Sequence, residues 1–322
     1  MQEFRFTSYA PGDEAHILDL FPRAYGGRTM TERYWRWRFQ DNPAGHHYIE
    51  LAWVGEQLVG HYAISPVVVT LEGQDVLTAL SGTTMIHPDF QRRGLFWTLG
   101  ERLYERLDRE GFLCVWGFPN IKSHKGIVRD LKWQDIREIP YFQLDLSHTP
   151  RPHEIAPSIE EVTEFDGRFD DLWNAVKTDY RILVRRDRRY LQWRFTPLPD
   201  DGWRTYRILV YVEGGKLCGY AVCNTYLNQH LQIVDILTIN ELSVALELVN
   251  AATVFALQEN RRTVRMWLPV EHPLHWALES KGFTGQSPLT FFGARLFAPS
   301  REILRLIHMF RWYYMMSDSD VF

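Results

Sequence analysis

The stretch with the clearest chemical potential is residues 83–96, TTMIHPDFQRRGLF, in which an apolar strand end meets a His-Pro turn. The turn leads through QRRG into a leucine-rich segment that begins at Leu95. Such a loop presents backbone N–H groups at the N-terminus of a helix, where the first amides have no partner within the helix and the helix dipole is positive. Arg92 and Arg93 add positive charge, and Gly94 lets a phosphate approach the backbone closely. These features predict an anion site that fits a pyrophosphate.

The elements around this loop are predicted from hydrophobic spacing. Leucines at 95, 99, 103 and 107 recur every four residues, which is typical of one face of a helix, and Gly111 follows where a C-terminal cap belongs. Residues 114–120, CVWGFPN, then predict a buried strand, and residues 121–131 predict a second helix. The anion loop is therefore expected between a strand and a helix, beside a second strand and helix.

The chain also repeats itself with a period near 150 residues. YWRWRF at 34–39 returns as YLQWRF at 190–195, and each copy is followed by a strand, a tight glycine-containing turn and another strand. Because the hexapeptide occurs in both copies, a packing role is favoured over a ligand-binding role. A repeat of this length indicates a duplicated domain rather than a solenoid.

The alternation of helices and strands in each copy predicts an α/β fold of two tandem units, each a mixed, mostly antiparallel sheet flanked by helices. The second unit lacks the anion loop, because LQIVDILTI runs into residues 240–243 without Arg or Gly. Asn240 is the expected N-cap of a helix over 241–259, and the second unit is expected to be structural or to shape an acceptor cleft. The expected divisions are a first unit at 1–147, a proline-rich linker at 148–158, a degenerate unit at 159–298, and a C-terminal helix and tail at 299–322.

Bulk composition argues against several classes of function. The net charge of −4 at pH 7, with no basic block, does not suit a nucleic-acid-binding face. The cysteines Cys114, Cys218 and Cys223 form no disulfide framework and lack histidines at ligand spacing, so we expect a reducing compartment and no metal site. The sequence shows no run of 18 apolar residues and no signal-like start, so we expect a cytoplasmic protein without a membrane partner.

The stretch 83–96 resembles motif A of the GNAT acetyltransferases, whose pattern is Gln/Arg-x-x-Gly-x-Gly/Ala after a strand that ends in His-Pro. Residues 91–95 match this pattern, whereas Phe96 departs from its final small position. The sequence RRGLF at 92–96 resembles that of tandem GNAT proteins of the enhanced-intracellular-survival type. The resemblance covers residues 1–146 and is architectural only over 160–297. It implies an acyl-coenzyme A, in the first place acetyl-CoA, as co-substrate, and it implies no metal.

The same resemblance implies which residues hold the cofactor. The backbone at Met85 and Ile86 would contact pantetheine, and Asn120 would contact the cofactor just before the next helix. The pyrophosphate would lie against Gln91, Arg92, Arg93, Gly94, Leu95 and Phe96.

The catalytic groups are much less clear. Direct transfer needs a base that takes a proton from the amine and an acid that protonates the leaving thiolate. The tyrosine that usually serves as the acid in this family falls here on Val128, so that hydroxyl is absent. His124, one turn earlier, could titrate near neutrality, although a lone histidine is more often a surface or capping residue. Enhanced-intracellular-survival proteins use their C-terminal carboxylate as the base, so Phe322 is a second candidate; the simpler interpretation is a packed helix over 300–316 with a loose end.

The expected function is that of an acyl-CoA-dependent N-acyltransferase, an N-acetyltransferase in the first place, acting on a small amine. The 12 Trp, 15 Tyr and 19 Phe motivate an amino sugar as acceptor, although aromatic residues mostly fill cores. Val128 and Phe96 favour an alternative, a non-catalytic acyl-CoA-binding or regulatory protein. A second alternative is an aminoacyl-transferase of the peptidoglycan-bridge type, against which the intact loop and the lack of a basic face for tRNA count. The sequence leaves the acceptor, the acyl chain length and the oligomeric state open.

Overall fold

The computed structural model of the protein describes residues 3–147, 152–196, 205–226, 229–297 and 312–319. Its predicted hairpins form because glycines in the left-handed region close their turns, Gly55 (φ 58°) in the first unit and Gly214 (φ 57°) in the second. The elements of the first unit are β1 (Arg5–Ser8), α1 (Glu14–Ala24), α2 (Glu32–Phe39), β2 (Tyr48–Val54), β3 (Gln57–Leu71), β4 (Gln74–Ile86), the 3-10 turn η1 (Pro88–Phe90), α3 (Leu95–Arg109), β5 (Cys114–Gly117), α4 (Ile121–Asp130) and β6 (Gln134–Asp145). Those of the second unit and the C-terminal segment are β7 (Ile159–Val162), α5 (Gly167–Val176), β8 (Ile182–Val184), α6 (Arg188–Phe195), β9 (Tyr206–Glu213), β10 (Lys216–Tyr226), β11 (His230–Thr238), α7 (Leu242–Gln258), β12 (Thr263–Met266), α8 (Pro273–Glu279), β13 (Thr284–Leu296), β14 (Trp312–Tyr313) and the 3-10 turn η2 (Met316–Asp318).

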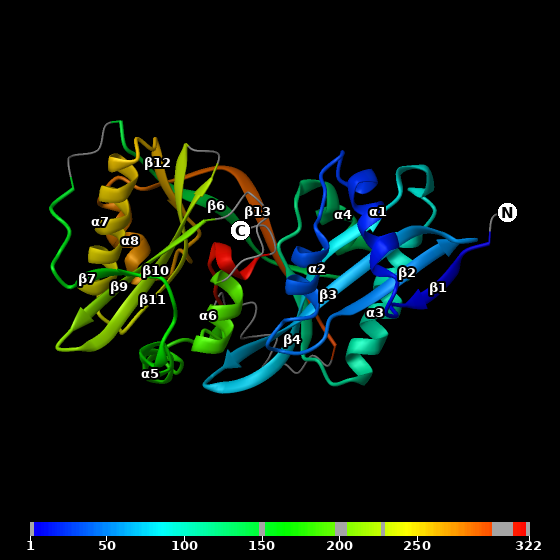
Figure 1. The fold of residues 1–322 in the computed structure, drawn as a ribbon, viewed down its shortest axis with the longest axis horizontal. Coiled ribbons are helices and arrows are strands. Elements are labelled where there is room, and N and C mark those ends of the chain that lie inside the picture. Colours follow the sequence, from blue (N-terminus) through cyan, green and yellow to red (C-terminus); the bar gives the residue numbers. More distant parts are fainter. Residues whose placement is uncertain (1–2, 148–151, 197–204, 227–228, 298–311, 320–322) are drawn as a thin grey trace.

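These strands join one continuous sheet (Figure 1). Its main path runs β1-β2-β3-β4-β5-β13-β6-β12-β11-β10-β9-β7, while β8 pairs with both β3 and β14. Most of the pairings are antiparallel, and the parallel ones are β4 with β5, β11 with β12, and β8 with β14. The structure therefore confirms the predicted fold of two mixed, mostly antiparallel α/β units.

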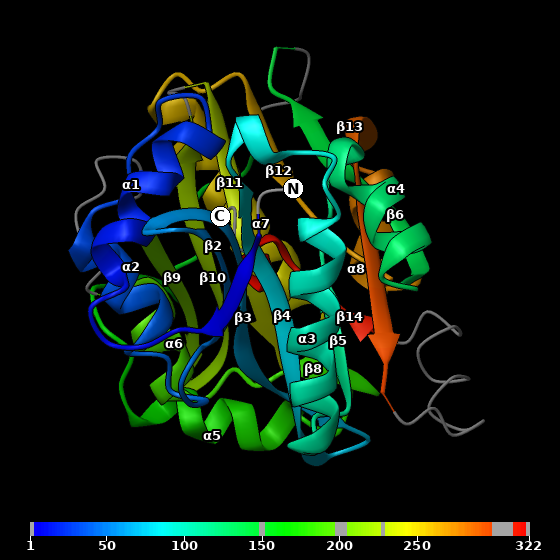
Figure 2. The same ribbon diagram turned by 90° about the vertical axis from the view of Figure 1, so that its right-hand side faces the viewer.

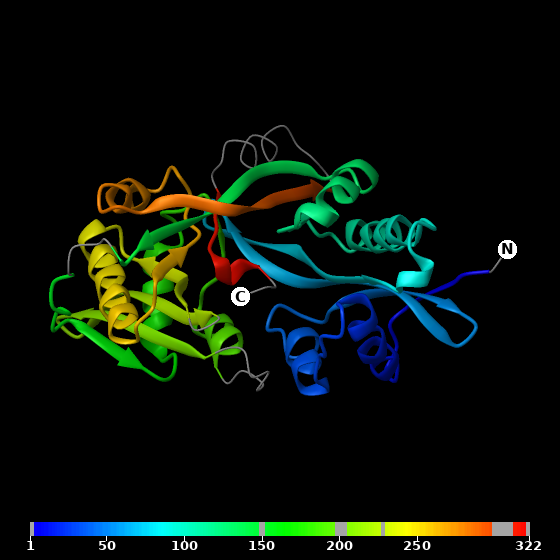
Figure 3. The same ribbon diagram turned by 90° about the horizontal axis from the view of Figure 1, so that it is seen from above.

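The two units exchange strands at their junction. β13 of the second unit lies between β5 and β6 of the first, with Gly293 opposite Gly117. β6 pairs in turn with β12 of the second unit, with Leu144 opposite Val264. Figure 3 shows β6 and β13, coloured green and orange, running side by side from one unit to the other. Each unit thus completes its sheet with a strand from the other. The predicted boundaries of the units therefore do not correspond to a break in the sheet, and they remain a prediction.

Helices cover both faces of the first unit's sheet (Figure 2). The leucine stripe of α3 packs on one face as predicted, and none of its four leucines is more than 2% exposed. On the other face, α1 and α2 contribute Leu20 and Trp35 to a separate core that also holds Met85 of β4. A third core fills the second unit and the junction, and it includes Trp116 of β5 and Phe292 of β13.

The repeated aromatic hexapeptides lie on α2 and α6, which meet at the boundary between the units. The indole rings of Trp37 and Trp193 stack with their centroids 5.4 Å apart and an interplanar angle of 22°. Each indole N–H donates to the backbone carbonyl of the other residue, at 2.7 Å from Trp37 and 3.0 Å from Trp193. These reciprocal contacts confirm the packing role of the hexapeptide and indicate an approximate twofold relation between the units at this point.

Two predicted details of the second half are wrong. The N-cap of α7 is Glu241 rather than Asn240, because the chain is still extended at Glu241 (φ −127°, ψ 111°) and makes no side-chain cap bond. The predicted C-terminal helix falls largely outside the described residues, but residues 312–319 form β14 and η2 instead of a helix. Every residue from 312 to 316 is at most 4% exposed. The segment therefore has no polar face to give an amphipathic helix, and an apolar run that is buried on all sides suits a short strand.

Candidate active site

The predicted anion loop links β4 to α3 through η1 and a short turn. The N–H of Gln91 donates to the carbonyl of Pro88 (3.3 Å), and the N–H of Thr98 donates to the carbonyl of Gly94 (3.0 Å), which starts α3. Arg92 and Gly94 lie in the left-handed region, with φ of 61° and 77°. Gly94 is the N-cap of α3, and no side-chain cap bond is formed there. The loop therefore leaves first-turn N–H groups available to an anion, as the sequence predicts.

The side chains of this loop are exposed and carry positive charge. Gln91, Arg92 and Arg93 all face solvent, and the guanidinium of Arg93 lies over the ring of Phe90 at 5.2 Å. Leu95 differs, because its side chain is 2% exposed and anchors α3 in the core, so it can serve a ligand only through its backbone. The loop thus combines a helix N-terminus with two arginines.

Phe96, the bulky departure from the motif, packs in the seam between α3 and α4. Its ring stacks on Tyr62 with the centroids 5.8 Å apart and an interplanar angle of 18°. The same ring lies 3.5 Å from the point where a Cβ on Gly126 of α4 would stand. A glycine on the neighbouring helix therefore makes room for the side chain that the motif would have kept small.

β4 and β5 separate just before the loop. They pair only at residues 79–80 with residues 115–116, although β4 continues to Ile86. A strand that continues beyond its partner leaves backbone groups without ladder bonds along that edge. The side chain of Met85 is 1% exposed in the core under α1 and α2, and Ile86 is half-buried. This geometry is compatible with the predicted contribution of both residues through their backbone.

The open stretch of β4 is irregular, and two side chains hold its carbonyl groups. Its register with β3 shifts between His61 and Ala63, and Thr83 has a φ of 52°, which is rare for a β-branched residue. His61 Nδ1 lies 2.8 Å from the carbonyl oxygen of Thr83, and the hydroxyl of Tyr25 donates to the carbonyl oxygen of Thr84 at 3.1 Å. Sequence reasoning missed both side chains, because the contacts join residues 22 and 59 positions apart and no local pattern marks them.

His61 has an unusual environment. It is fully buried, and this burial lowers its pKa to about 4. The ring is therefore neutral at pH 7, and Nδ1 carries the proton that binds the Thr83 carbonyl. Its Nε2 has no hydrogen-bond partner within the described part of the chain. His61 thus contributes to the position of the irregular stretch rather than to surface charge.

Asn120, predicted to contact the cofactor, is the N-cap of α4. Its Oδ1 accepts hydrogen bonds from the backbone N–H groups of Lys122 (2.9 Å) and Ser123 (3.2 Å). This is the usual role of Asn at a helix start, and it orders the first turn of α4. Its predicted contact with the cofactor remains a prediction.

Of the two weak catalytic candidates, His124 lies within the described residues and Phe322 does not. His124 Nε2 lies 2.7 Å from Asp135 Oδ1, and its ring stacks on Phe291 of β13 at 3.8 Å. Val128, one turn further along α4, is half-buried and offers no hydroxyl. Phe322 lies outside the described residues, so the proposed carboxylate base is a prediction without a position.

In the described connection between β11 and α7, residues 239–241 form no counterpart of the anion loop, and the C-terminal segment packs against β11. The hydroxyl of Tyr313 donates to the carbonyl of Ile236 on β11 at 2.6 Å, and Ser317 Oγ donates to Asp235 at 3.0 Å. All three residues of η2 are buried there. The C-terminal segment therefore packs directly against β11.

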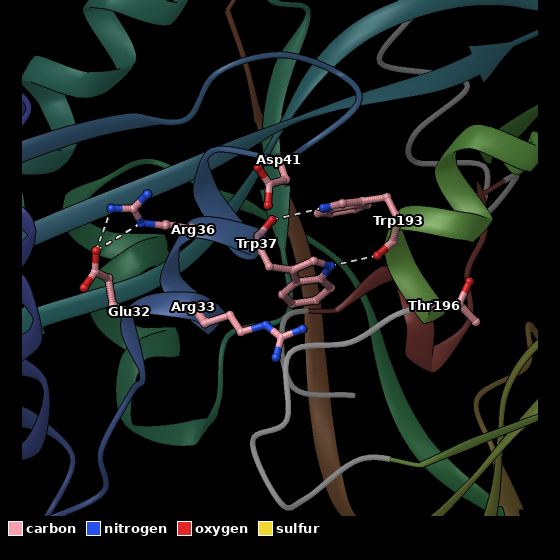
Figure 4. A pocket seen from close by; sticks show the side chains of 7 residues that line it. All are labelled: Glu32, Arg33, Arg36, Trp37, Asp41, Trp193 and Thr196. Atoms are coloured by element: carbon pink, nitrogen blue, oxygen red, sulfur yellow. Dashed lines mark hydrogen bonds and ion pairs between the residues drawn. The ribbon is translucent and has the colours of Figure 1, made fainter.

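Two open hollows lie away from the loop, between the units. One has a volume of about 870 Å³ and is lined by residues of α5 and α6 together with Asp41 and Asp75. The other has a volume of about 580 Å³, and Figure 4 shows it beside the stacked tryptophans. Its lining residues are Glu32, Arg33, Arg36, Trp37, Asp41, Trp193 and Thr196. Neither hollow contains a residue of the predicted site.

The described ranges lack two kinds of feature. No three His, Cys, Asp or Glu side chains in these ranges gather so that they could hold a metal ion. No helix in the same part of the chain is long and apolar enough to cross a membrane.

Residues 5–134 match the family model of the acetyltransferase (GNAT) domain, and no relative is found among curated proteins. Among solved structures, the chain is similar to a probable N-acyltransferase from Enterococcus faecalis V583, with a TM-score of 0.71, 15% identity, and coverage of 91% of this chain and 73% of that one. It is also similar to the N-myristoyltransferase of Saccharomyces cerevisiae with bound myristoyl-CoA, with a TM-score of 0.66, 12% identity, and coverage of 93% and 84%. A tandem GNAT protein from the clavulanic acid biosynthesis pathway gives a TM-score of 0.62, 16% identity, and coverage of 92% and 100%.

These similarities extend over both units and not only over the matched stretch. At such low identities the solved structures establish the fold alone. The family model matches the first unit up to the start of β6. Residues 5–134 therefore match the acetyltransferase (GNAT) domain, and the chain as a whole has the fold of the tandem GNAT structure.

Proposed function

We propose that the protein is an acyl-CoA-dependent N-acyltransferase whose first unit binds the acyl-CoA. One observation carries the proposal: the anion loop and the open, irregular stretch lie at the two ends of one segment of β4. Residues 82–87 span about 16 Å at ~3.3 Å per residue, which is the scale of an extended pantetheine arm. A cofactor with its pyrophosphate on the loop would therefore bring its thioester to the irregular stretch at Thr83.

The loop residues then have distinct roles. The first-turn N–H groups of α3 bind the pyrophosphate oxygens, and Arg92 and Arg93 supply charge beside them. The backbone of Met85 and Ile86 runs along the pantetheine arm. The yeast enzyme with bound myristoyl-CoA supports an acyl-CoA in general as co-substrate, and we propose acetyl-CoA as the first donor to test.

The acceptor is proposed as a small amine. Many of the aromatic side chains that motivated an amino sugar are buried in the cores, Trp35 and Trp116 among them, so amino sugars are one class in the acceptor panel rather than a favoured one. The similarity of RRGLF to the enhanced-intracellular-survival type remains a prediction. A cytoplasmic location is proposed as well, and the free, buried state of Cys114, Cys218 and Cys223 supports it.

The test is a calorimetric titration of acetyl-CoA into the wild type and two matched variants. Gly94→Trp places an indole at the loop, where a Cβ would meet no atom within 4 Å. Gly111→Trp is the control, because Gly111 has nearly the same φ (80° against 77°) and the same open surroundings at the other end of α3. Both variants carry a similar backbone strain of about 1–2 kcal/mol, so a difference between them reports on the loop.

We expect micromolar binding in the wild type and in Gly111→Trp, and a loss of binding of at least about 100-fold in Gly94→Trp, which corresponds to roughly 3 kcal/mol. Equal binding in the two variants would place the cofactor elsewhere. No binding to the wild type at millimolar acetyl-CoA would remove the proposed function. If acetyl-CoA binds but no amine in the panel is acylated, the non-catalytic alternative takes its place.

A further inference from the structure

The hydroxyl of Tyr25 occupies a distinctive place in the first unit. Tyr25 ends α1 and stands outside the cores, with 38% of its surface exposed. Its ring packs on Phe21 at 4.7 Å, and its hydroxyl donates to the Thr84 carbonyl across 59 positions of sequence. The hydroxyl is thus held in place by β4 on a side chain that is partly exposed.

The backbone that Tyr25 contacts is the strained part of β4. Thr83 has a positive φ, its carbonyl is held by His61, and the carbonyl of the next residue is held by Tyr25. Residues in sparsely populated regions of φ and ψ persist only when their surroundings hold them, and they cluster at functional sites. Two long-range side-chain contacts to consecutive carbonyls are such surroundings.

Another hydroxyl near this stretch is already engaged. The hydroxyl of Tyr62 lies 2.6 Å from that of Tyr104 and 3.0 Å from Ser81 Oγ, and the Tyr62 side chain is fully buried under α3. Trp133 Nε1 donates to the Tyr104 hydroxyl at 3.0 Å. This network is closed to solvent, and burial raises the pKa of Tyr62. The Tyr62 hydroxyl is therefore enclosed in the core under α3, whereas Tyr25 is partly exposed.

We propose that Tyr25 lies at the thioester end of the bound acyl-CoA and donates the proton to the leaving thiolate. The inference rests on the proposed function. The amine nitrogen forms the new C–N bond as the C–S bond breaks, and the phenolic proton passes to the thiolate, which gives the free thiol. The proton released by the amine nitrogen returns to the Tyr25 oxygen through solvent. The hydroxyl that position 128 lacks is thereby supplied from α1.

A tethering experiment tests the location without any knowledge of the acceptor. The native cysteines are all buried, so Tyr25→Cys adds an accessible thiol. The probe is the 2-pyridyl disulfide of coenzyme A, and the reference reagent is the 2-pyridyl disulfide of cysteamine, which lacks the nucleotide and most of the pantetheine. Tyr48→Cys is the matched control, because Tyr48 is also partly exposed and its hydroxyl contacts Glu110, the C-cap residue of α3.

We expect the ratio of the two labelling rates, coenzyme A reagent over cysteamine reagent, to be at least about tenfold higher for Tyr25→Cys than for Tyr48→Cys, because a bound reagent has a high effective concentration at its target. Acetyl-CoA should suppress the difference. Equal ratios, in protein that binds acetyl-CoA by calorimetry, overturn the inference and leave the proposed function intact. Failure of acetyl-CoA to bind the wild type is instead a failure of the proposed function.

The role as proton donor has its own test. Tyr25→Phe keeps the ring on Phe21 and removes only the hydroxyl, so the dissociation constant for acetyl-CoA should change less than about threefold while kcat on an amine that the wild type accepts falls by about 100-fold or more. The fall should be greatest for acyl donors with poor leaving groups. An unchanged kcat removes the proton-donor role, and a raised dissociation constant with unchanged kcat reduces Tyr25 to a binding residue.

Discussion

Replacing Arg186 by Met removes one guanidinium that two buried carboxylates share. Arg186 Nε lies 3.0 Å from Asp235 Oδ1, and its Nη2 lies 3.0 Å from both carboxylate oxygens of Asp318. All three side chains are at most 1% exposed. Met fills a similar volume without a charge, so both carboxylates stay in the interior. Removing one partner of a buried ion pair costs about 3–5 kcal/mol, and we expect the free energy of unfolding to fall by that amount at neutral pH.

The loss should depend on pH in a defined direction. Burial raises the pKa of Asp318, and the charge of Arg186 opposes this rise. A carboxyl whose pKa is higher in the folded state favours folding most at low pH, and it loses that contribution as the pH rises through the folded pKa. Without Arg186 the pKa of Asp318 rises further. The deficit of the variant relative to the wild type should therefore be smallest near pH 4 and largest near pH 7.5.

Urea unfolding followed by circular dichroism at several pH values measures both quantities. Arg185→Met is the control, because that guanidinium is 42% exposed and pairs with Asp75 at 3.1 Å and Asp187 at 2.6 Å. Such exposed pairs contribute about 0–1 kcal/mol. The reasoning is refuted if Arg186→Met costs no more than the control at neutral pH, or if its deficit does not shrink toward acidic pH.

Three further predictions concern other contacts. Burial lowers the pKa of His61 to about 4. Its contribution to the free energy of unfolding, about 3 kcal/mol, is therefore present above pH 6.5 and is lost as the pH falls toward 4. In His61→Asn the acid side of the stability-against-pH curve should be flatter, and an unchanged curve would contradict this. Trp37→Phe and Trp193→Phe should each cost about 1–2 kcal/mol with a coupling of about 1 kcal/mol in a double-mutant cycle, whereas additive losses would show that the reciprocal bonds are not coupled. A Cβ on Gly100 would stand 2.6 Å from Leu131 Cδ2 in a buried site. Although Ala favours helices, Gly100→Ala should therefore lower the thermal midpoint through a net loss of about 1–2 kcal/mol. A raised midpoint would show that the Leu131 side chain can move.

The sequence by itself determined the features that depend on neighbours along the chain. The loop between Gln91 and Phe96, the leucine stripe of α3 and the glycine turns of the two hairpins were all predictable, because caps, turns and helical periodicity are set within a few residues. The duplication was predictable as well, because the hexapeptide at 34–39 recurs at 190–195. Met85 and Ile86 end β4 directly before the loop, whereas Asn120 starts α4 after β5, and their contacts with a cofactor remain a prediction.

Only the tertiary structure decided how the units join and what surrounds the irregular stretch. A strand that is paired on both sides has the same hydrophobic pattern whether its neighbour comes from its own unit or from the other. The exchange of β6 and β13 therefore cannot be recognised from the local sequence. The contacts of Tyr25 and His61 with β4 depend on the register of the sheet and on how α1 packs over it. The segment 312–319 shows the same limit, because the helix predicted over 300–316 from apolar spacing is replaced at its end by the buried strand β14 and the turn η2.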